Sequence, residues 1–177
     1  MPTFTLYNMR AAQKKLISLA EDMEERGCQI SILTELWECE ENFCDKLKEI
    51  GEKRTIKYIS NPRKTGKKGG GCGFLLMGED FHLTKLNVQV PKNLETCWGL
   101  LKTTKPNSEI KKIIFGVFYY PPKSRMKTPL LNHLNVTINI LKLEHPSAQV
   151  VILGDRNEIP MRDLGKIHSS LTLFQSQ

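Results

Sequence analysis

Two carboxylates follow strand-like apolar segments in this sequence of 177 residues. Glu35 comes directly after residues 29–34, and Asp155 follows residues 148–153 across Gly154. Ligands gather at the carboxyl ends of strands in open α/β sheets, so we expect the two acids to converge. Acids held together repel each other unless a cation lies between them, and oxygen ligands of this kind suit Mg²⁺. The pair therefore predicts a Mg²⁺ site, which could also accept Mn²⁺, although an Asp after a buried strand is more often a turn or a helix cap.

Three further polar residues lie beside these segments. Asn157 is two residues after Asp155, and across a tight turn both side chains can face one ligand, although an Asx turn is the commoner use of this pattern. Tyr119 precedes a second tyrosine and two prolines that fix the exit of the chain, so its phenol could donate to a phosphate oxygen or pack as a strand-end aromatic. Asn8 closes the first segment and could cap the next helix or aim its amide into the site.

Basic residues cluster in two loops of a chain whose net charge is +7. This charge favours a polyanionic partner, and two basic loops that flank candidate catalytic segments predict contact with a phosphate backbone. Solvated loops are the alternative interpretation of either cluster taken alone. The first cluster, within residues 61–71, holds Arg63, Lys64, Lys67 and Lys68 and no acid, and the second holds Lys123, Arg125 and Lys127.

The elements that must position these residues alternate between strand and helix patterns. Strands are expected at residues 3–8, 29–34, 55–60, 72–77, 82–88, 95–103, 110–119 and 148–153. Helices are expected at residues 10–26, 40–50 and 128–143, with Gly27 and Gly51 as stops, whereas residues 158–177 show no clear pattern. This order predicts an α/β protein with a mixed sheet and helices in separate layers.

Composition limits the class of protein. The length suits one domain, and the hydrophobic fraction of 40% suits a folded chain. The sequence has no run of about 18 apolar residues and no basic-then-apolar start, so we expect neither a membrane span nor a secretory signal. Its five cysteines form no C-x-x-C pair. They are interpreted as reduced thiols, without a zinc site, in a nuclear or cytoplasmic protein.

Taken in order, the motifs resemble the endonuclease/exonuclease/phosphatase superfamily. That group includes deoxyribonuclease I, the apurinic/apyrimidinic endonucleases, inositol polyphosphate 5-phosphatases and the target-nicking endonucleases of LINE-type (non-LTR) retrotransposons. The glycine triplet and the Y-x-P-P element are most similar to the retrotransposon branch, and the resemblance spans roughly residues 3–157. The motifs are a strand ending in Asn8, TELW at residues 34–37, GGGCGFLL at residues 69–76, FYYPP at residues 118–122 and VVILGDRN at residues 150–157.

The resemblance implies a deoxyribonuclease I-like α/β sandwich of two sheets with helices on the outer faces. It implies Mg²⁺-dependent hydrolysis of DNA phosphodiesters by a retrotransposon-type endonuclease, the kind associated with a reverse transcriptase. Glu35 matches the family's metal-binding glutamate, and Asn8 matches the asparagine that supports the metal site. Tyr119 matches the active-site tyrosine. Asp155 matches the residue that handles the nucleophile or leaving group, and Asn157 matches the one that binds the scissile phosphate.

Two departures from the family pattern matter. Arg156 stands where the family usually has Phe or another apolar residue. The family also continues past G-D-x-N to a further Asp and a final S-D-H, which His168 in KIHSS does not match. We therefore expect residues 1–177 to form one incomplete domain with impaired hydrolysis and an uncovered sheet face that could support self-association. A non-catalytic nucleic-acid-binding remnant and a small-phosphoester phosphatase of the same superfamily stay open as alternatives.

Overall fold

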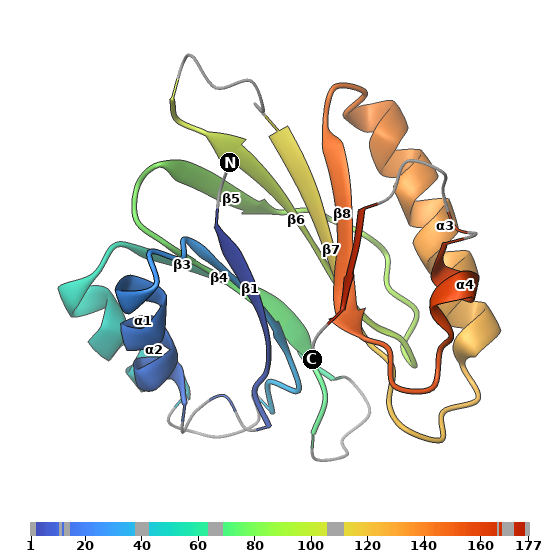
Figure 1. Ribbon diagram of the computed structural model, residues 1–177, viewed down its shortest axis with the longest axis horizontal. Coiled ribbons are helices and arrows are strands. Elements are labelled where there is room, and N and C mark those ends of the chain that lie inside the picture. The colour runs from blue at the N-terminus through green and yellow to red at the C-terminus, as the bar shows by residue number, and fades with distance from the viewer. Residues whose placement is uncertain are drawn as a thin grey trace.

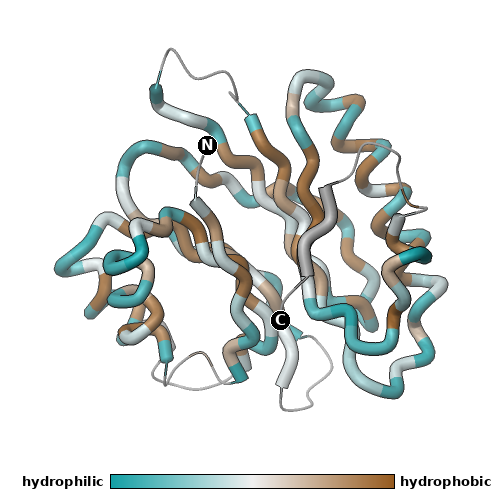
Figure 2. Tube along the Cα trace, viewed as in Figure 1, coloured by the Kyte–Doolittle hydropathy of each residue, from teal (hydrophilic) through white to brown (hydrophobic). Residues whose placement is uncertain are grey.

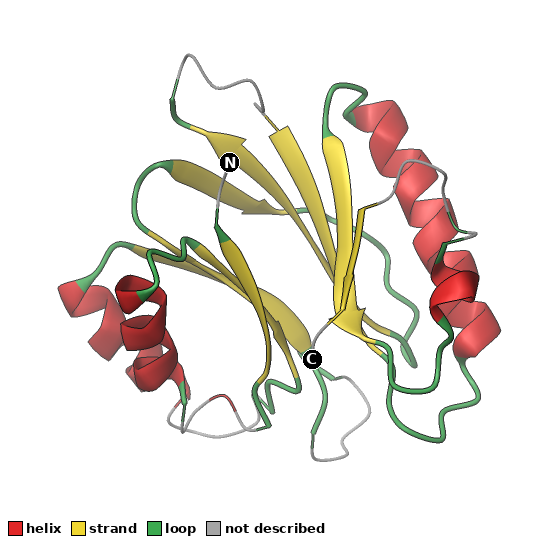
Figure 3. Cartoon of the chain, in the orientation of Figure 1, coloured by secondary structure: helices red, strands yellow, loops and turns green. Residues whose placement is uncertain are grey.

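Two β-sheets lie face to face, with helices on both outer faces, in the computed structural model of the protein (Figure 1). The structure describes residues 3–10, 12, 15–37, 43–63, 69–105, 112–165, 167 and 172–175. Figure 3 shows the same arrangement by element type: strands in the middle of the molecule and helices at both sides.

The first sheet has four strands in the order β1-β2-β4-β3. β1 and β2 are parallel, whereas β4 runs antiparallel to both β2 and β3. β2 and β4 are buried along their whole length, which explains why both are continuous apolar runs in the sequence rather than alternating ones. The bounds are Phe4–Asn8 for β1, Ile30–Thr34 for β2, Ile56–Asn61 for β3 and Cys72–Met77 for β4.

The second sheet has five strands in the order β5-β6-β7-β8-β9. β5, β6 and β7 are successively antiparallel, and β7, β8 and β9 are parallel. Because β7 and β8 are parallel neighbours, their carboxyl ends meet at one edge of the sheet, and the first residue of β6 lies at that edge as well. The bounds are Phe81–Lys85 for β5, Glu95–Thr103 for β6, Lys112–Tyr119 for β7, Gln149–Asp155 for β8 and Thr172–Gln175 for β9.

Four helices in the described residues cover the outer faces of the sheets (Figure 1). α1 (Leu16–Glu25) and α2 (Phe43–Lys53) lie on the first sheet, and α3 (Lys127–Glu144) and α4 (Met161–Leu164) lie on the second. A third apolar cluster fills the space between the sheets, where the rings of Phe74 and Phe115 lie 6.3 Å apart. Figure 2 shows hydrophobic residues concentrated along the facing strands and on the inner sides of the helices.

The expected two-sheet α/β sandwich with outer helices is confirmed, and the boundaries of some elements differ from expectation. α2 continues through Gly51 to Lys53, because Gly51 keeps a helical backbone, unlike Gly27, whose φ of 60° ends α1 as expected. Burial of Ile50 against the first sheet holds this last turn in place. The helix expected at residues 10–26 begins at Leu16 in the described residues.

Two further differences concern segments with weak sequence patterns. The strand expected at residues 82–88 ends at Lys85, because the N–H of Val88 bonds to the carbonyl of Leu86 instead of to a neighbouring strand. Residues 158–177, which show no clear pattern, contain α4 and β9. Both elements are only four residues long, too short for a hydrophobic period to emerge. No helix in the described part of the chain is both long and apolar enough to cross a membrane.

Candidate active site

Strands from both sheets end close together at one edge of the sandwich. Register pairs Asn8, the last residue of β1, with Thr34, so Glu35 follows immediately beside it. In the other sheet, register pairs Tyr119 at the end of β7 with Asp155 at the end of β8. The two sheets thereby deliver four of the residues singled out in the sequence to one place.

The side-chain amide of Asn8 joins the two carboxylates. Its Nδ2 donates to Glu35 Oε1 at 2.9 Å and to Asp155 Oδ2 at 2.9 Å. The two acids are 120 residues apart in the sequence, yet these oxygens cannot be farther apart than twice one hydrogen-bond length. Asn8 Oδ1 is buried and has no hydrogen-bond partner in the described part of the chain, so the site keeps an acceptor oxygen that nothing satisfies.

Glu35 has a left-handed backbone, with φ of 53°. Few residues other than glycine adopt this conformation, and it costs a β-carbon-bearing residue roughly 1 kcal/mol or more. The conformation is held from the glycine triplet, because Trp37 N–H donates to the Gly70 carbonyl at 3.0 Å and Leu36 N–H donates to the Gly71 carbonyl at 3.4 Å. Glu35 thus combines a left-handed backbone with a side chain that accepts the Asn8 amide.

Tyr119 is buried between acids, with 7% of its surface exposed. Burial raises the pKa of its phenol well above the ordinary value, and the nearby charge of Glu35, a hydrogen bond to Glu35 and the charges of Asp155 and Glu95 raise it further. The phenol therefore keeps its proton at neutral pH and serves as a hydrogen-bond donor. The neighbouring Tyr120 points the other way, into the apolar cluster under α3, and its hydroxyl donates to the Ser124 carbonyl.

A largely buried ion pair lies next to Tyr119. Arg63 donates to Glu95 Oε1 through Nε at 2.8 Å and approaches it through a terminal nitrogen at 2.6 Å, and the side chains are 16% and 9% exposed. Arg63 also lies over the Tyr119 ring, 6.0 Å from its centroid. The sequence pattern predicts that Arg63 contacts nucleic acid, and the structure instead shows its guanidinium held by a neighbouring acid, so the phosphate contact stays a prediction.

The turn after β8 has the Asx-turn form, and the predicted contact of Asn157 with a phosphate stays a prediction. The backbone N–H of Asn157 donates to Asp155 Oδ1 at 3.3 Å, as in an Asx turn, and Asn157 has a φ of 41°. The Asn157 amide donates to the Tyr120 carbonyl at 2.7 Å, so it ties the end of β8 to the end of β7. Arg156 donates to the Ile159 carbonyl at 2.6 Å, which shows that this unusual residue stabilises its own turn.

The remaining predicted basic residues divide into two groups. Lys123 and Arg125 are exposed on the loop that leaves Tyr120 for α3, and the backbone N–H of Lys123 donates to Glu158 at 3.3 Å. Their loop starts at the strand end that carries Tyr119, so both cations flank the site. The other three, Lys64, Lys67 and Lys68, lie outside the described residues.

The donors at this site are hard oxygens, which match Mg²⁺. Two carboxylates and the unsatisfied Asn8 carbonyl oxygen could hold an ion that keeps several of its own waters and needs only one or two protein carboxylates. The described residues contain no group of three or more His, Cys, Asp or Glu side chains placed to hold a metal. An open, water-rich site is therefore the kind that these residues fit.

Solved structures share this architecture, whereas no protein-family model and no curated protein matches the sequence. The endonuclease domain of TRAS1, a telomere-specific non-LTR retrotransposon, has a TM-score of 0.63 at 12% identity, over 94% of this chain and 71% of that chain. A mannosyl-6-phosphatase of Bacteroides thetaiotaomicron has a TM-score of 0.63 at 15% identity, over 96% and 70%. An endonuclease/exonuclease/phosphatase from Bacteroides vulgatus has a TM-score of 0.60 at 12% identity, over 92% and 70%.

The chain has the endonuclease/exonuclease/phosphatase fold. The resemblance inferred from the motifs is thus confirmed at the level of the fold, since identities this low carry no more than that. The structure brings Asn8, Glu35, Tyr119 and Asp155 together, and their chemical roles stay predictions. Sequence reasoning missed Glu95, whose only signal was a carboxylate at the start of an apolar strand expected to pair with the strand that carries Tyr119.

Proposed function

We propose that this chain is a Mg²⁺-dependent phosphodiesterase that nicks DNA, an endonuclease of the retrotransposon type. One observation carries the proposal: a single amide, that of Asn8, holds Glu35 and Asp155 at 2.9 Å each, beside the buried phenol of Tyr119. Two acids brought this close from opposite sheets create a site whose charge favours a divalent cation.

Glu35, Asp155 and the carbonyl oxygen of Asn8 would hold the ion. When bound, Mg²⁺ would polarise a phosphoryl oxygen and make a coordinated water more acidic. The local charges support this assignment, because Glu35, Asp155 and Glu95 bring three acids around Tyr119, and among the described residues Arg63 is the cation paired with them. The formal excess matches the charge of one divalent ion.

The Tyr119 phenol would position the substrate by donating a hydrogen bond to a non-bridging phosphate oxygen. Its raised pKa keeps the phenol neutral, and a neutral donor between acids can face an anionic phosphate without further repulsion. Asp155, which accepts the Asn8 amide and pairs in register with Tyr119, would accept a proton from an attacking water. Asn157 holds the turn that carries Asp155 through its bond to Tyr120.

DNA is favoured as the substrate by charge. The chain has a net charge of +7, and Lys123 and Arg125 are exposed on the loop after Tyr120, where they could neutralise backbone phosphates. The likeness to the TRAS1 endonuclease domain agrees with this choice. The equal TM-score of the mannosyl-6-phosphatase makes hydrolysis of a small phosphoester the second candidate.

We expect slow turnover. Within the described residues no hydrogen bond joins a histidine to Glu35 or Asp155, and His133 instead pairs with Thr96 on β6 at 3.0 Å. Loss of a general acid–base group typically lowers rates about 10²- to 10⁴-fold. The assay must therefore detect single nicks, and relaxation of supercoiled plasmid does so.

The test is plasmid nicking by the full chain in Mg²⁺ or Mn²⁺, with Glu35→Ala and Asp155→Ala as inactive variants. Glu24→Ala is the matched control, because Glu24 is an exposed acid whose partner is Arg54, away from the site. We expect nicking by the wild type and by the control alone. No nicking above a mock preparation would reject the nuclease. Turnover of a sugar phosphate would then favour the phosphatase, and salt-sensitive DNA binding without cleavage would favour a non-catalytic remnant.

A further inference from the structure

A buried carboxylate, Glu95, connects the glycine triplet to the core of the site. One of its oxygens takes the guanidinium of Arg63, and the other accepts the backbone N–H of Gly71 at 2.6 Å. The side chain is 9% exposed, so both oxygens are satisfied inside the protein. Gly70 lies against the pair so closely that a β-carbon there would overlap Glu95 Oε2 and Arg63 Nε. The glycine triplet at residues 69–71 therefore packs directly against the ion pair.

The same glycines hold the backbone that carries Glu35. The carbonyls of Gly70 and Gly71 accept the N–H groups of Trp37 and Leu36, which directly follow Glu35 in its left-handed conformation. A displaced triplet would release both bonds and leave this turn with the bond from the N–H of Ala12 to the Leu36 carbonyl at 2.9 Å. The ion pair is thus connected to the turn at Glu35 through the hydrogen bonds of the glycine triplet.

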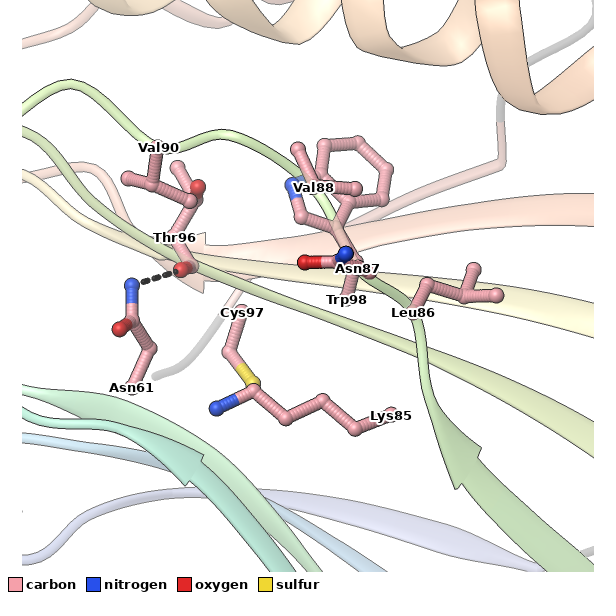
Figure 4. A pocket seen from close by; sticks show the side chains of 9 residues that line it. All are labelled: Asn61, Lys85, Leu86, Asn87, Val88, Val90, Thr96, Cys97 and Trp98. Atoms are coloured by element: carbon pink, nitrogen blue, oxygen red, sulfur yellow. Dashed lines mark hydrogen bonds between the residues drawn. The ribbon is translucent and has the colours of Figure 1, made fainter.

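The pair also fixes the surroundings of Tyr119. Register places Glu95 on β6 directly beside Tyr119 on β7, and the Arg63 guanidinium lies over the Tyr119 ring. Asn61, two residues before Arg63, reaches across to β6 and donates through Nδ2 to the Thr96 carbonyl at 2.8 Å (Figure 4). This bond joins the end of β3 to β6 beside a pocket of about 330 Å³. It therefore fixes the position of the backbone that leads into Arg63.

We propose that Arg63 and Glu95 are positioning residues that hold Glu35 and Tyr119 in place for a divalent ion and a phosphate. The inference rests on the function proposed above. It adds that Arg63, which the sequence predicts to contact DNA, instead orients other residues of the site. Because Arg63 reaches Glu95 Oε1 through two nitrogens and both side chains are largely buried, lysine cannot replace arginine without losing one of these contacts.

Positioning and simple electrostatics predict opposite results for one variant. Glu95→Gln removes a negative charge and should weaken cation binding under either explanation. Arg63→Met removes a positive charge, so electrostatics alone predicts tighter binding, whereas loss of positioning predicts weaker binding. The double variant keeps the wild-type net charge, so electrostatics predicts recovery and positioning predicts none.

The experiment is calorimetric titration of the full chain with Mn²⁺ alone, without DNA. We expect Arg63→Met, Glu95→Gln and their combination each to raise the Mn²⁺ dissociation constant about tenfold or more, the usual effect of losing a group that orients metal ligands. Arg63→Lys, the milder change, should do the same. In the plasmid assay the variants should lower kcat with little change in KM.

The matched control is the pair formed by Arg54 and Glu24, which has the same residue types and two hydrogen bonds of 2.7 and 2.8 Å. Arg54→Met and Glu24→Gln should leave Mn²⁺ binding unchanged. Circular dichroism checks folding, and Arg63→Lys decides the matter if Arg63→Met does not fold. Binding as tight as wild type in the Arg63 variants, or recovery in the double variant, overturns the positioning role alone. A wild type that binds no Mn²⁺ overturns the proposed function and this inference with it.

Discussion

Glu35 and Asp155 share one hydrogen-bond donor, the side-chain amide of Asn8. One acid follows a strand of the first sheet and the other ends a strand of the second, so the amide links the two layers of the sandwich at the site. In the absence of a cation, the two hydrogen bonds from Asn8 help to offset the repulsion between the carboxylates. This arrangement makes stability and metal binding interdependent, and both can be measured.

Replacing Asn8 by Ala should destabilise the metal-free protein by about 1–3 kcal/mol, because two close carboxylates lose their common donor. Urea unfolding in EDTA measures the change. Asn135→Ala, at an exposed position on α3, is the control and should stay within about 0.5 kcal/mol of wild type. An Asn8→Ala protein as stable as the control would show that the shared amide contributes nothing.

Glu35→Gln should have opposite effects with and without Mg²⁺. In EDTA it should stabilise the fold by about 1 kcal/mol, because Gln keeps an acceptor for Asn8 and removes the repulsion with Asp155. Saturating Mg²⁺ should stabilise the wild type by about 2.7 kcal/mol at a hundredfold excess over the dissociation constant, and the variant far less. Unfolding curves with and without Mg²⁺ give both values, and an equal Mg²⁺ effect in the two proteins would argue against a metal at Glu35.

Tyr119→Phe should change how stability depends on alkaline pH. Burial and the charge of Glu35 raise the folded-state pKa of Tyr119, whereas tyrosine in an unfolded chain ionises near about pH 10. The unfolded chain therefore loses this proton first, and the stability that Tyr119 contributes below about pH 10 is lost as the pH rises further. The free energy of unfolding of wild type, relative to the variant, should fall between about pH 9 and about pH 11. A constant difference would contradict the raised pKa.

Gly70→Ala should be far more damaging than Gly78→Ala. Both glycines have positive φ, 74° and 87°, so alanine is strained at either position. A β-carbon at Gly78 meets nothing within 4 Å, whereas one at Gly70 would overlap Glu95 and Arg63. We expect a loss of about 1 kcal/mol at Gly78 from backbone strain and about 3 kcal/mol or more at Gly70, with nicking activity lost only in the latter. Similar losses of stability at the two positions would mean that Arg63 and Glu95 move aside at little energetic cost.

Lys123→Ala with Arg125→Ala should weaken DNA binding and flatten its dependence on salt. If both cations contact phosphates, the slope of log affinity against log salt should fall by about two units, with little sequence dependence. Fluorescence anisotropy with a labelled duplex at several salt concentrations measures the slope. Lys57→Ala with Lys102→Ala, two exposed lysines on β3 and β6, is the charge-matched control. A slope that changes equally in both double variants would indicate a general charge effect instead of a site.

Much of the fold was predictable because its strands are strongly patterned. Glu35 directly follows the apolar run of β2, and Asp155 is the last residue of β8. Ligands gather at the carboxyl ends of strands, so the sequence predicted that the two acids converge. β9 was not predictable, since a four-residue strand pairs with β8 through backbone bonds that leave little trace in composition. The end of α2 was misplaced because Gly51 has no local need for a left-handed backbone, and packing of Ile50 extends the helix past it.

The sequence by itself determined which residue types stand at the strand ends. Asn8, Glu35, Tyr119 and Asp155 can be placed there because each lies where a local apolar run stops. Only the tertiary structure decided that Arg63 pairs with Glu95, because that contact joins residues 32 positions apart across two sheets. A charged side chain beside a glycine-rich segment is expected to be solvent-exposed until the packing of the two sheets brings a buried carboxylate to it. Hydrophobic periodicity in the sequence shows which face of a single helix or strand is buried. An ion pair between distant residues depends on how two such elements pack together, which periodicity does not show.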